Sequence, residues 1–255
     1  MSEARYIYCI ANRDEEKTFG RIGLEKSPVY TIPWKEICVV VHDCVSSPYQ
    51  SEDQETVRSW LVSHERVIET AWEHFGNVLP LGFDTIVKPD EENDAPENIK
   101  KWLMNDYKKL KQKFKKLEGK AEFGVQVFWY PQAIAQKLME THQQLRNLNK
   151  EIQSKPPGMA YLYKQKLDTI LRNQMEKEAQ RYFEKFYKQI DEKVEEVKVE
   201  KVKKSEDEKQ MIMNLSCLSP SENSKDLGDD LEKIDKKKEF SVRFTGPWPP
   251  YSFVQ

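Results

Sequence analysis

The segment Pro156-Pro157-Gly158 interrupts a long run of helical sequence and constrains the fold more than any other short stretch of this chain. Before it, apolar residues recur at helical spacing from Ile134 to Ile152, and a second stripe runs from Tyr163 to Ile190. Proline lacks the N–H that a helix interior needs, so one continuous helix does not pass through this segment. The sequence therefore predicts a long helical hairpin that turns here.

Strand patterns flank this hairpin. Apolar residues typical of strands occupy 121–130, 194–202, 211–218 and 240–245, and a short helical face precedes the last of these at Leu227, Leu231 and Ile234. We expect residues 203–209 to form a charged turn that pairs the second and third strands. The order β, helical hairpin, β, β, α, β is the split βαβ order of a ferredoxin-like fold with one helix doubled.

The first third of the chain also mixes strands and helices. Strand patterns occur at 6–11, 29–32 and 37–45, the last apolar enough to lie inside a sheet. Ser51 with Gln54 resembles a capping box, so we expect a helix that starts there and ends at Gly76. Residues 78–87 read as a strand that Pro80 breaks or bulges.

Charge is distributed in blocks that suggest a domain boundary. Residues 90–97 are acidic and contain proline, and a helical stretch at 99–117 carries eight lysines: Lys100, Lys101, Lys108, Lys109, Lys111, Lys113, Lys115 and Lys116. We therefore predict an α+β protein of two domains. These are residues 1–88, a connecting linker and helix at 89–120, and a ferredoxin-like C-terminal domain at 121–255.

Composition argues against several classes of function. The chain has 41 basic and 43 acidic residues, so it lacks the net positive charge of a nucleic-acid binder. It shows no apolar leader and no stretch long enough to span a bilayer, and we expect a cytoplasmic protein without a membrane partner. No phosphate-binding or nucleophile-elbow glycine motif occurs, which argues against a nucleotide-binding enzyme.

The residues that bear catalytic or metal-binding chemistry do not assume productive spacing. Consecutive strand residues face opposite sides, so His42 and Asp43 of the run His42-Asp43-Cys44 do not converge on one substrate. His64 and His142 lie on apolar stripes and are expected to be hydrogen-bonded core or interface residues. Glu65, Glu69 and Glu73 read as a solvated helix face. The cysteines Cys9, Cys38, Cys44 and Cys217 form no CxxC pair and are expected to be buried thiols. We predict no catalytic residue, metal or cofactor.

A proline-rich aromatic segment follows the last strand. Gly246 permits a turn, and three prolines then fix the backbone between large aromatic residues, in the set Pro247, Trp248, Pro249, Pro250, Tyr251 and Phe253. Aromatic residues on a rigid backbone lose little entropy when they meet a partner. The segment is therefore either a partner-binding surface or a cover for the edge of its own sheet.

Five segments stand out when taken in order along the chain: Tyr6-Ile-Tyr-Cys-Ile-Ala11, His64 followed by Val78-Leu-Pro-Leu-Gly-Phe83, Glu122-Phe-Gly-Val-Gln-Val127, Pro157-Gly-Met-Ala-Tyr-Leu162 and Gly246-Pro-Trp-Pro-Pro-Tyr-Ser-Phe253. Together they resemble the gas vesicle protein F/L family. The chain departs from the family pattern after Leu81, where Gly82-Phe83-Asp84 replaces the more usual Arg-Phe-Gly. Any role tied to an arginine there does not transfer.

The resemblance implies a non-catalytic accessory protein, associated with gas vesicles, that binds the small hydrophobic shell protein and other accessory proteins and supports vesicle nucleation or assembly. Two alternatives stay open. The protein could be a minor structural component of the finished vesicle, or a module that binds nucleic acid or an anionic surface through Lys100 to Lys116.

Overall fold

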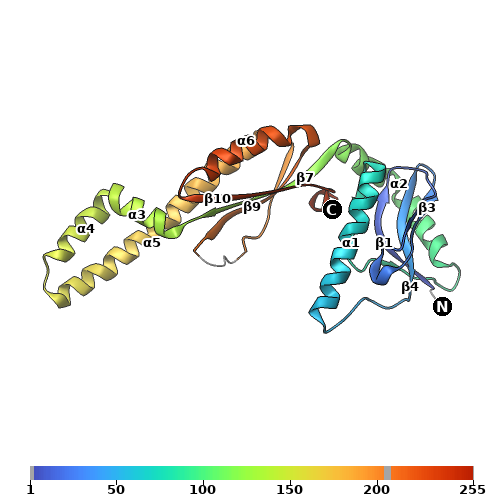
Figure 1. Ribbon diagram of the computed structural model, residues 1–255, viewed down its shortest axis with the longest axis horizontal. Coiled ribbons are helices and arrows are strands. Elements are labelled where there is room, and N and C mark those ends of the chain that lie inside the picture. Colours follow the sequence, from blue (N-terminus) through green and yellow to red (C-terminus); the bar gives the residue numbers. More distant parts are fainter. Residues whose placement is uncertain (1–2, 204–207, 255) are drawn as a thin grey trace. The chain divides into compact units, whose positions relative to one another are not determined.

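The alternation of strands and helices expected from the sequence is present in the computed structural model, which describes residues 3–203 and 208–254 (Figure 1). Of the predicted charged turn at 203–209, residues 204–207 lie outside the described residues. The chain divides into two compact units. The first contains residues up to Glu122 together with Pro247–Gln255, and the second contains Phe123–Gly246.

The first unit is built on a sheet with the strand order β2-β3-β4-β1-β5, and β6 also pairs with β1. The strands are β1 (Ala4–Ala11), β2 (Thr18–Gly20), β3 (Val29–Trp34), β4 (Ile37–Cys44), β5 (Val78–Pro80) and β6 (Ile86–Val87), with a short 3-10 turn at Leu24–Lys26. As predicted, β4 lies inside the sheet. The stretch expected as one broken strand at 78–87 forms two short strands instead, β5 and β6, with a loop between them.

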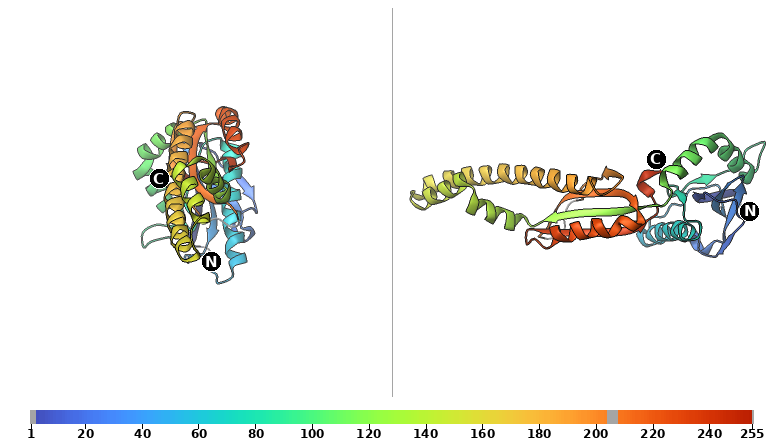
Figure 2. Two further views of the ribbon diagram at one scale, coloured as in Figure 1. Left: turned by 90° about the vertical axis from the view of Figure 1, so that its left-hand side faces the viewer. Right: turned by 90° about the horizontal axis from the view of Figure 1, so that it is seen from above.

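Two helices cover the faces of this sheet, α1 (Gln54–Phe75) on one side and α2 (Ala95–Leu117) on the other (Figure 2). Asp53, rather than the predicted Ser51, is the N-cap of α1 and accepts hydrogen bonds from the N–H groups of Glu55 and Thr56. Gly76 ends α1 in the left-handed conformation at φ 74°, as expected.

The lysine-rich helix α2 differs from the predicted connection between domains. Its buried residues, among them Ile99, Leu103 and Phe114, pack against the sheet of the first unit. It begins at Ala95 with Asp94 as N-cap, so the last residues of the predicted acidic linker belong to the helix. Its apolar stripe is wide enough to make it part of the core, and the lysines occupy its other faces.

The second unit contains a sheet with the strand order β10-β7-β9-β8. Its strands are β7 (Lys120–Trp129), β8 (Glu196–Val199), β9 (Gln210–Pro220) and β10 (Phe240–Trp248), and β8 pairs with β9 in antiparallel register. The final helix is α6 (Ser224–Asp235), preceded by a 3-10 turn at Ser221–Asn223. Strand β10 continues three residues beyond the predicted Thr245, so Gly246, at φ 114°, lies within the strand and not in a turn.

The helical hairpin is present and turns at the predicted prolines (Figure 1). One arm is α5 (Pro157–Asp191), and the other is broken into α3 (Pro131–Thr141) and α4 (Gln143–Gln153), although its apolar stripe predicted a single helix. His142 adopts extended dihedrals between α3 and α4, where its carbonyl accepts the first hydrogen bond of α4 from Arg146. The spacing of apolar residues alone does not reveal a helix break at a single residue.

Candidate functional site

The core beneath α1 contains two tyrosine–histidine pairs. The Tyr6 hydroxyl lies 2.9 Å from Nδ1 of His64, and the Tyr8 hydroxyl lies 2.8 Å from Nδ1 of His42. Both tyrosines and His42 are fully buried, and His64 is 5% exposed. Buried polar groups are costly unless hydrogen-bonded, so these two pairs define how β1, β4 and α1 fit together.

The hydrogen-bond directions around His64 follow from its neighbours. Its Nε2 lies 3.1 Å from the carbonyl of Leu81, and a carbonyl only accepts, so Nε2 carries the proton. Nδ1 therefore accepts from the Tyr6 hydroxyl, whose oxygen accepts in turn from the N–H of Asp84 at 3.0 Å. The direction of each hydrogen bond in this chain of contacts is therefore fixed, and these bonds hold the loop at 81–84 in place.

The second pair reaches two other loops. The Tyr8 hydroxyl accepts from the N–H of Leu24 at 3.0 Å, and Nε2 of His42 lies 3.0 Å from the Tyr49 hydroxyl. The N–H of Tyr49 donates to the carboxylate of Asp84 at 3.0 Å, which joins the two pairs into one Tyr–His network. A bulge at Tyr8 in the pairing of β1 with β4 allows both Tyr8 and Cys9 to pack into this core.

The Tyr–His network explains part of the difference between Gly82-Phe83-Asp84 and the Arg-Phe-Gly that is more usual in the family. Asp84 adopts a positive φ of 65°, a conformation that aspartate tolerates better than most residues, and both its N–H and its carboxylate are used. Phe83 packs edge-on to Tyr6 and His64. Gly82 has no positive φ and open space around its Cβ position, so nothing in the structure requires glycine there.

Burial shifts the ionisation of these side chains. Loss of solvation lowers the pKa of His42 to about 4 and lowers the pKa of His64 below its usual value. The same effect raises the pKa of Tyr49 to about 12 and moves those of Tyr6 and Tyr8 upward. All five tyrosine and histidine side chains are therefore neutral at pH 7.

The other candidates from the sequence lie apart. Asp43 faces outward, where it contacts the guanidinium of Arg5 and accepts from the Tyr30 hydroxyl, so it does not meet His42. His74 contacts Glu15 on the surface at 2.9 Å, well away from the buried His64. Burial first, and then the like charges of Glu65 and Glu73, raise the pKa of Glu69 in the predicted carboxylate row.

The four cysteines, Cys9, Cys38, Cys44 and Cys217, are buried free thiols, as predicted. His142 is half-buried at the break between α3 and α4, and its Nδ1 has no hydrogen-bond partner, so the expected hydrogen bond to that nitrogen is missing.

Across residues 3–203 and 208–254, no three His, Cys, Asp or Glu side chains gather in a metal-binding arrangement. No helix in the described part of the chain is long and apolar enough to cross a membrane.

The C-terminal segment packs onto the first unit, although the sequence placed it in the second domain. Pro249, Pro250 and Phe253 are buried, and Tyr251 lies against the core cluster that contains Tyr6 and Tyr8. Burial raises the pKa of Tyr251, whose hydroxyl is enclosed without a hydrogen-bond partner. Tyr251 therefore covers the core of the first unit and not the edge of the sheet that contains β10, which differs from the covering role expected from the sequence.

Polar contacts fix the same segment. The N–H and hydroxyl of Ser252 donate to the two carboxylate oxygens of Glu122 at 2.7 and 2.6 Å, and Glu122 is only 8% exposed. The ammonium of Lys113 donates to the carbonyl of Val254. Trp248, between two prolines at the end of β10, differs from the buried Pro249, Pro250 and Phe253 because 41% of its surface is exposed. Nothing in the sequence signalled the role of Glu122.

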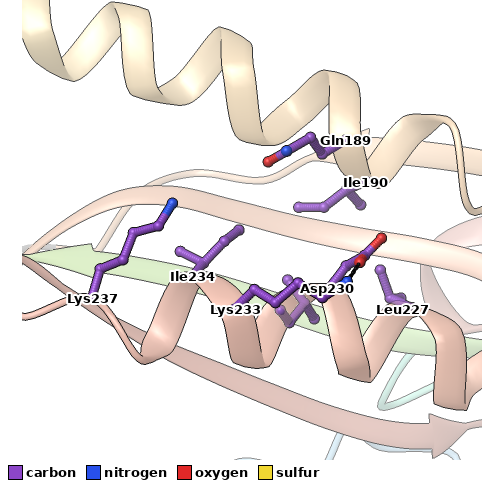
Figure 3. A pocket seen from close by; sticks show the side chains of 8 residues that line it. Gln189, Ile190, Leu227, Asp230, Lys233, Ile234 and Lys237 are labelled. Atoms are coloured by element: carbon purple, nitrogen blue, oxygen red, sulfur yellow. Dashed lines mark hydrogen bonds and ion pairs between the residues drawn. The ribbon is translucent and has the colours of Figure 1, made fainter.

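A groove of about 210 Å³ in the second unit contains no network of buried polar side chains like the Tyr–His network (Figure 3). Its floor consists of Ile190 from α5 and of Leu227, Leu231 and Ile234 from α6, all of which are buried. Asp230 and Lys233 form an ion pair at its edge, at 2.6 Å. The groove is the seam along which α5 and α6 pack.

Removing the Tyr6 hydroxyl tests the Tyr–His network. Tyr6→Phe leaves Nδ1 of His64 and the N–H of Asp84 unpaired, which should cost about 1–3 kcal/mol of unfolding free energy for each group. Tyr107→Phe is the matched control, because that hydroxyl makes a surface contact with Glu36 and its loss should change stability by no more than about 0.5 kcal/mol. Urea unfolding measures both. Equal effects of the two substitutions would contradict the assignment.

The lowered histidine pKa values predict acid sensitivity. Between pH 6.5 and about 4 the unfolded chain binds a proton at His42 that the folded chain does not, and the lowered pKa of His64 acts in the same direction below pH 6.5, so stability falls as the pH decreases. For His42 alone the full effect is about 3 kcal/mol. NMR titration of the imidazole Cε1 protons should show His42 neutral in the folded protein at pH 5.5 and a midpoint for His64 below 6.5. A midpoint near 6.5 for either would contradict the burial argument.

Comparison with known proteins places this geometry in a family. The sequence profile described as gas vesicle synthesis protein GvpL/GvpF matches residues 4–255. The chain is 28% identical over 262 residues to gas vesicle protein L1 of Halobacterium salinarum, covering 100% of this chain and 91% of that protein. It is also 28% identical to gas vesicle protein F of Dolichospermum flosaquae, covering 100% and 99%.

Solved structures agree on the fold. The crystal structure of GvpF from Anabaena sp. PCC7120 superposes with a TM-score of 0.79 at 24% identity, covering 100% of this chain and 99% of that one. GvpF from Microcystis aeruginosa gives a TM-score of 0.69 at 21% identity, covering 99% of both chains. The profile match over almost the whole sequence shows that this chain belongs to the GvpL/GvpF family of gas vesicle synthesis proteins, whose role is in gas vesicle formation.

Proposed function

We propose that this protein binds the small hydrophobic shell protein of gas vesicles and supports its nucleation and assembly without catalysis. The observation that carries the proposal is the exposed Trp248, held between Pro247 and Pro249 at the start of a segment whose remaining aromatic residues are packed. Shell monomers with exposed apolar surface or strand edges aggregate unless another protein covers them. An aromatic surface on a rigid frame suits that task.

Rigidity makes Trp248 an effective contact. Its neighbouring prolines fix φ, and the contact between Glu122 and Ser252 holds the chain four residues further on. Little conformational entropy is therefore lost when the indole meets a partner. Within the site expected from the sequence, we assign Pro247 and Trp248 to the binding surface, and Pro249, Pro250, Tyr251 and Phe253 to the support beneath it.

The buried histidines support a role without catalysis. Both ring nitrogens of His42 and both of His64 are already within hydrogen-bond distance of a protein partner, so neither ring holds a free site for a substrate proton. General acid–base catalysis requires a group within hydrogen-bond reach of the substrate. We infer that this network is structural and that no cofactor takes part.

We also propose that the second unit is a ferredoxin-like domain with an extended helical hairpin in place of its first helix. The strand order β10-β7-β9-β8 supports this reading, because the first strand of the unit lies between its fourth and third strands. Together with the order of helices, this is the arrangement expected from a split βαβ pattern. The hairpin is the main addition to it.

The two alternatives have less support. Several of the lysines expected to bind nucleic acid or an anionic surface make contacts within the protein, among them Lys100 with Glu97, Lys111 with Glu36, and Lys113 with the carbonyl of Val254. A permanent vesicle component and a transient assembly factor would both contact the shell protein through Trp248, so that contact does not distinguish them. Washing purified vesicles with urea and blotting for this protein separates those two, since a transient factor should be lost.

Trp248→Ala should weaken capture of the shell protein about 30-fold, the equivalent of about 2 kcal/mol for a central aromatic contact. Because the ring is partly exposed, thermal stability should fall by much less than the 3–5 kcal/mol typical of a fully buried aromatic residue. Leu61→Ala is the matched control, since Leu61 is a surface residue of the first unit with 40% exposure. Pulldown and thermal melting should be measured on the same samples.

Phe253→Ala tests the residues that support the binding surface. Because Phe253 is buried, the substitution should lower the melting temperature, while the variant that remains folded should still bind the shell protein. Wild-type capture by a normally folded Trp248→Ala variant would refute the proposal.

A further inference from the structure

The tip of the helical hairpin exposes large apolar side chains. Residues 152–167, which include the end of α4, the turn and the first turns of α5, form the end of the hairpin away from the sheet of the second unit (Figure 1). Here Met159 is 48% exposed, and Tyr161 and Leu162 are each 63% exposed. Isolated surface leucines are common, but three such residues within four positions form a patch.

Packing within the hairpin does not require these three residues. The arms are held together by buried leucines closer to the sheet, among them Leu145, Leu148 and Leu167. The Tyr161 hydroxyl accepts a hydrogen bond from the amide of Gln165 on the same helix, at 2.8 Å. Removing the apolar groups of Met159, Tyr161 or Leu162 should therefore leave the hairpin intact.

The same stretch has a one-sided charge. Between Glu151 and Asp168 the sequence contains no acidic residue and three lysines, Lys155, Lys164 and Lys166. The ammonium of Lys155 lies 5.4 Å from the centre of the Tyr163 ring. Within the described residues none of the three lysines forms an ion pair with a carboxylate. Their charge is therefore available to a partner.

Helical geometry places Lys164 and Lys166 on opposite sides of the pair Tyr161 and Leu162. At about 100° per residue, Tyr161 and Leu162 lie side by side on α5, with Lys164 beyond Tyr161 and with Lys166 beyond Leu162, between it and Met159. A complementary surface has an apolar centre with carboxylates on both flanks. An amphipathic helix with a stripe of apolar residues bordered by Asp and Glu presents that pattern.

We propose that this tip, formed by Lys155, Met159, Tyr161, Leu162, Lys164 and Lys166, docks an acidic amphipathic helix of another protein. The apolar side chains supply the desolvated centre of the contact, and the lysines supply charge complementarity at its rim. A single turn of apolar residues offers little area to a bilayer, where binding strength scales with buried apolar surface. The site is separate from Trp248 and does not depend on the function proposed for it.

Two synthetic helical peptides test the proposal by fluorescence anisotropy. One carries a leucine stripe flanked by glutamates, and the other has every glutamate replaced by lysine. The intact protein should bind the acidic peptide at least about tenfold more tightly than the basic one. The double variant Tyr161→Ser, Leu162→Ser should weaken that binding at least about tenfold. Met104→Ser is the control, because Met104 is 57% exposed on the lysine-rich α2.

Charge reversal provides a second, independent test of the proposal. Lys164→Glu with Lys166→Glu should reverse the preference between the peptides, whereas Lys108→Glu with Lys109→Glu on α2 makes the same net change and should leave it unchanged. Circular dichroism checks that each variant is folded. Equal effects of the tip and α2 variants would overturn the proposal, as would capture of phosphatidylserine vesicles through the tip without binding of the acidic peptide.

Discussion

The first unit depends on hydrogen bonds between two buried tyrosines of β1 and two buried histidines. Tyr6 and Tyr8 point toward α1 from the middle of the sheet, and their hydroxyls need partners there. His42 on β4 and His64 on α1 supply them, and the remaining capacity of all four groups fixes the loops at Leu24, Tyr49 and Leu81–Asp84. A shift of the helix or of the register by one residue would leave several polar atoms unpaired.

This core also receives the end of the chain. Tyr251 packs on the same cluster, and Ser252 is held by the carboxylate of Glu122. Four of the five segments that resemble the GvpL/GvpF family therefore serve two structural purposes: the Tyr–His network, and the attachment of the C-terminal segment. The fifth, Pro157–Leu162, contributes no comparable contact, and its exposed side chains remain available for binding.

The sequence predicted the parts of the fold that depend on periodicity. The hairpin turn at the two prolines, the Gly76 stop and the buried position of His64 all followed from spacing and local chemistry. What it missed depends on contacts distant in the chain. The partner of Ser252 lies 130 residues away, and the apolar stripe of α2 indicated a helix without indicating which sheet it covers. A strand that ends in prolines reads as a turn, yet β10 continues to Trp248 because an edge strand tolerates missing N–H groups.

We propose that the packed C-terminal segment presents Trp248 to the shell protein. A photo-crosslinking amino acid placed at position 248 tests it most directly, in cells that produce both proteins. Position 45, whose valine is 58% exposed on the first unit, is the comparison. We expect a cross-link to the shell protein from position 248 and none from position 45. Equal cross-linking from both positions, or none from 248 while the two proteins still copurify, would contradict it.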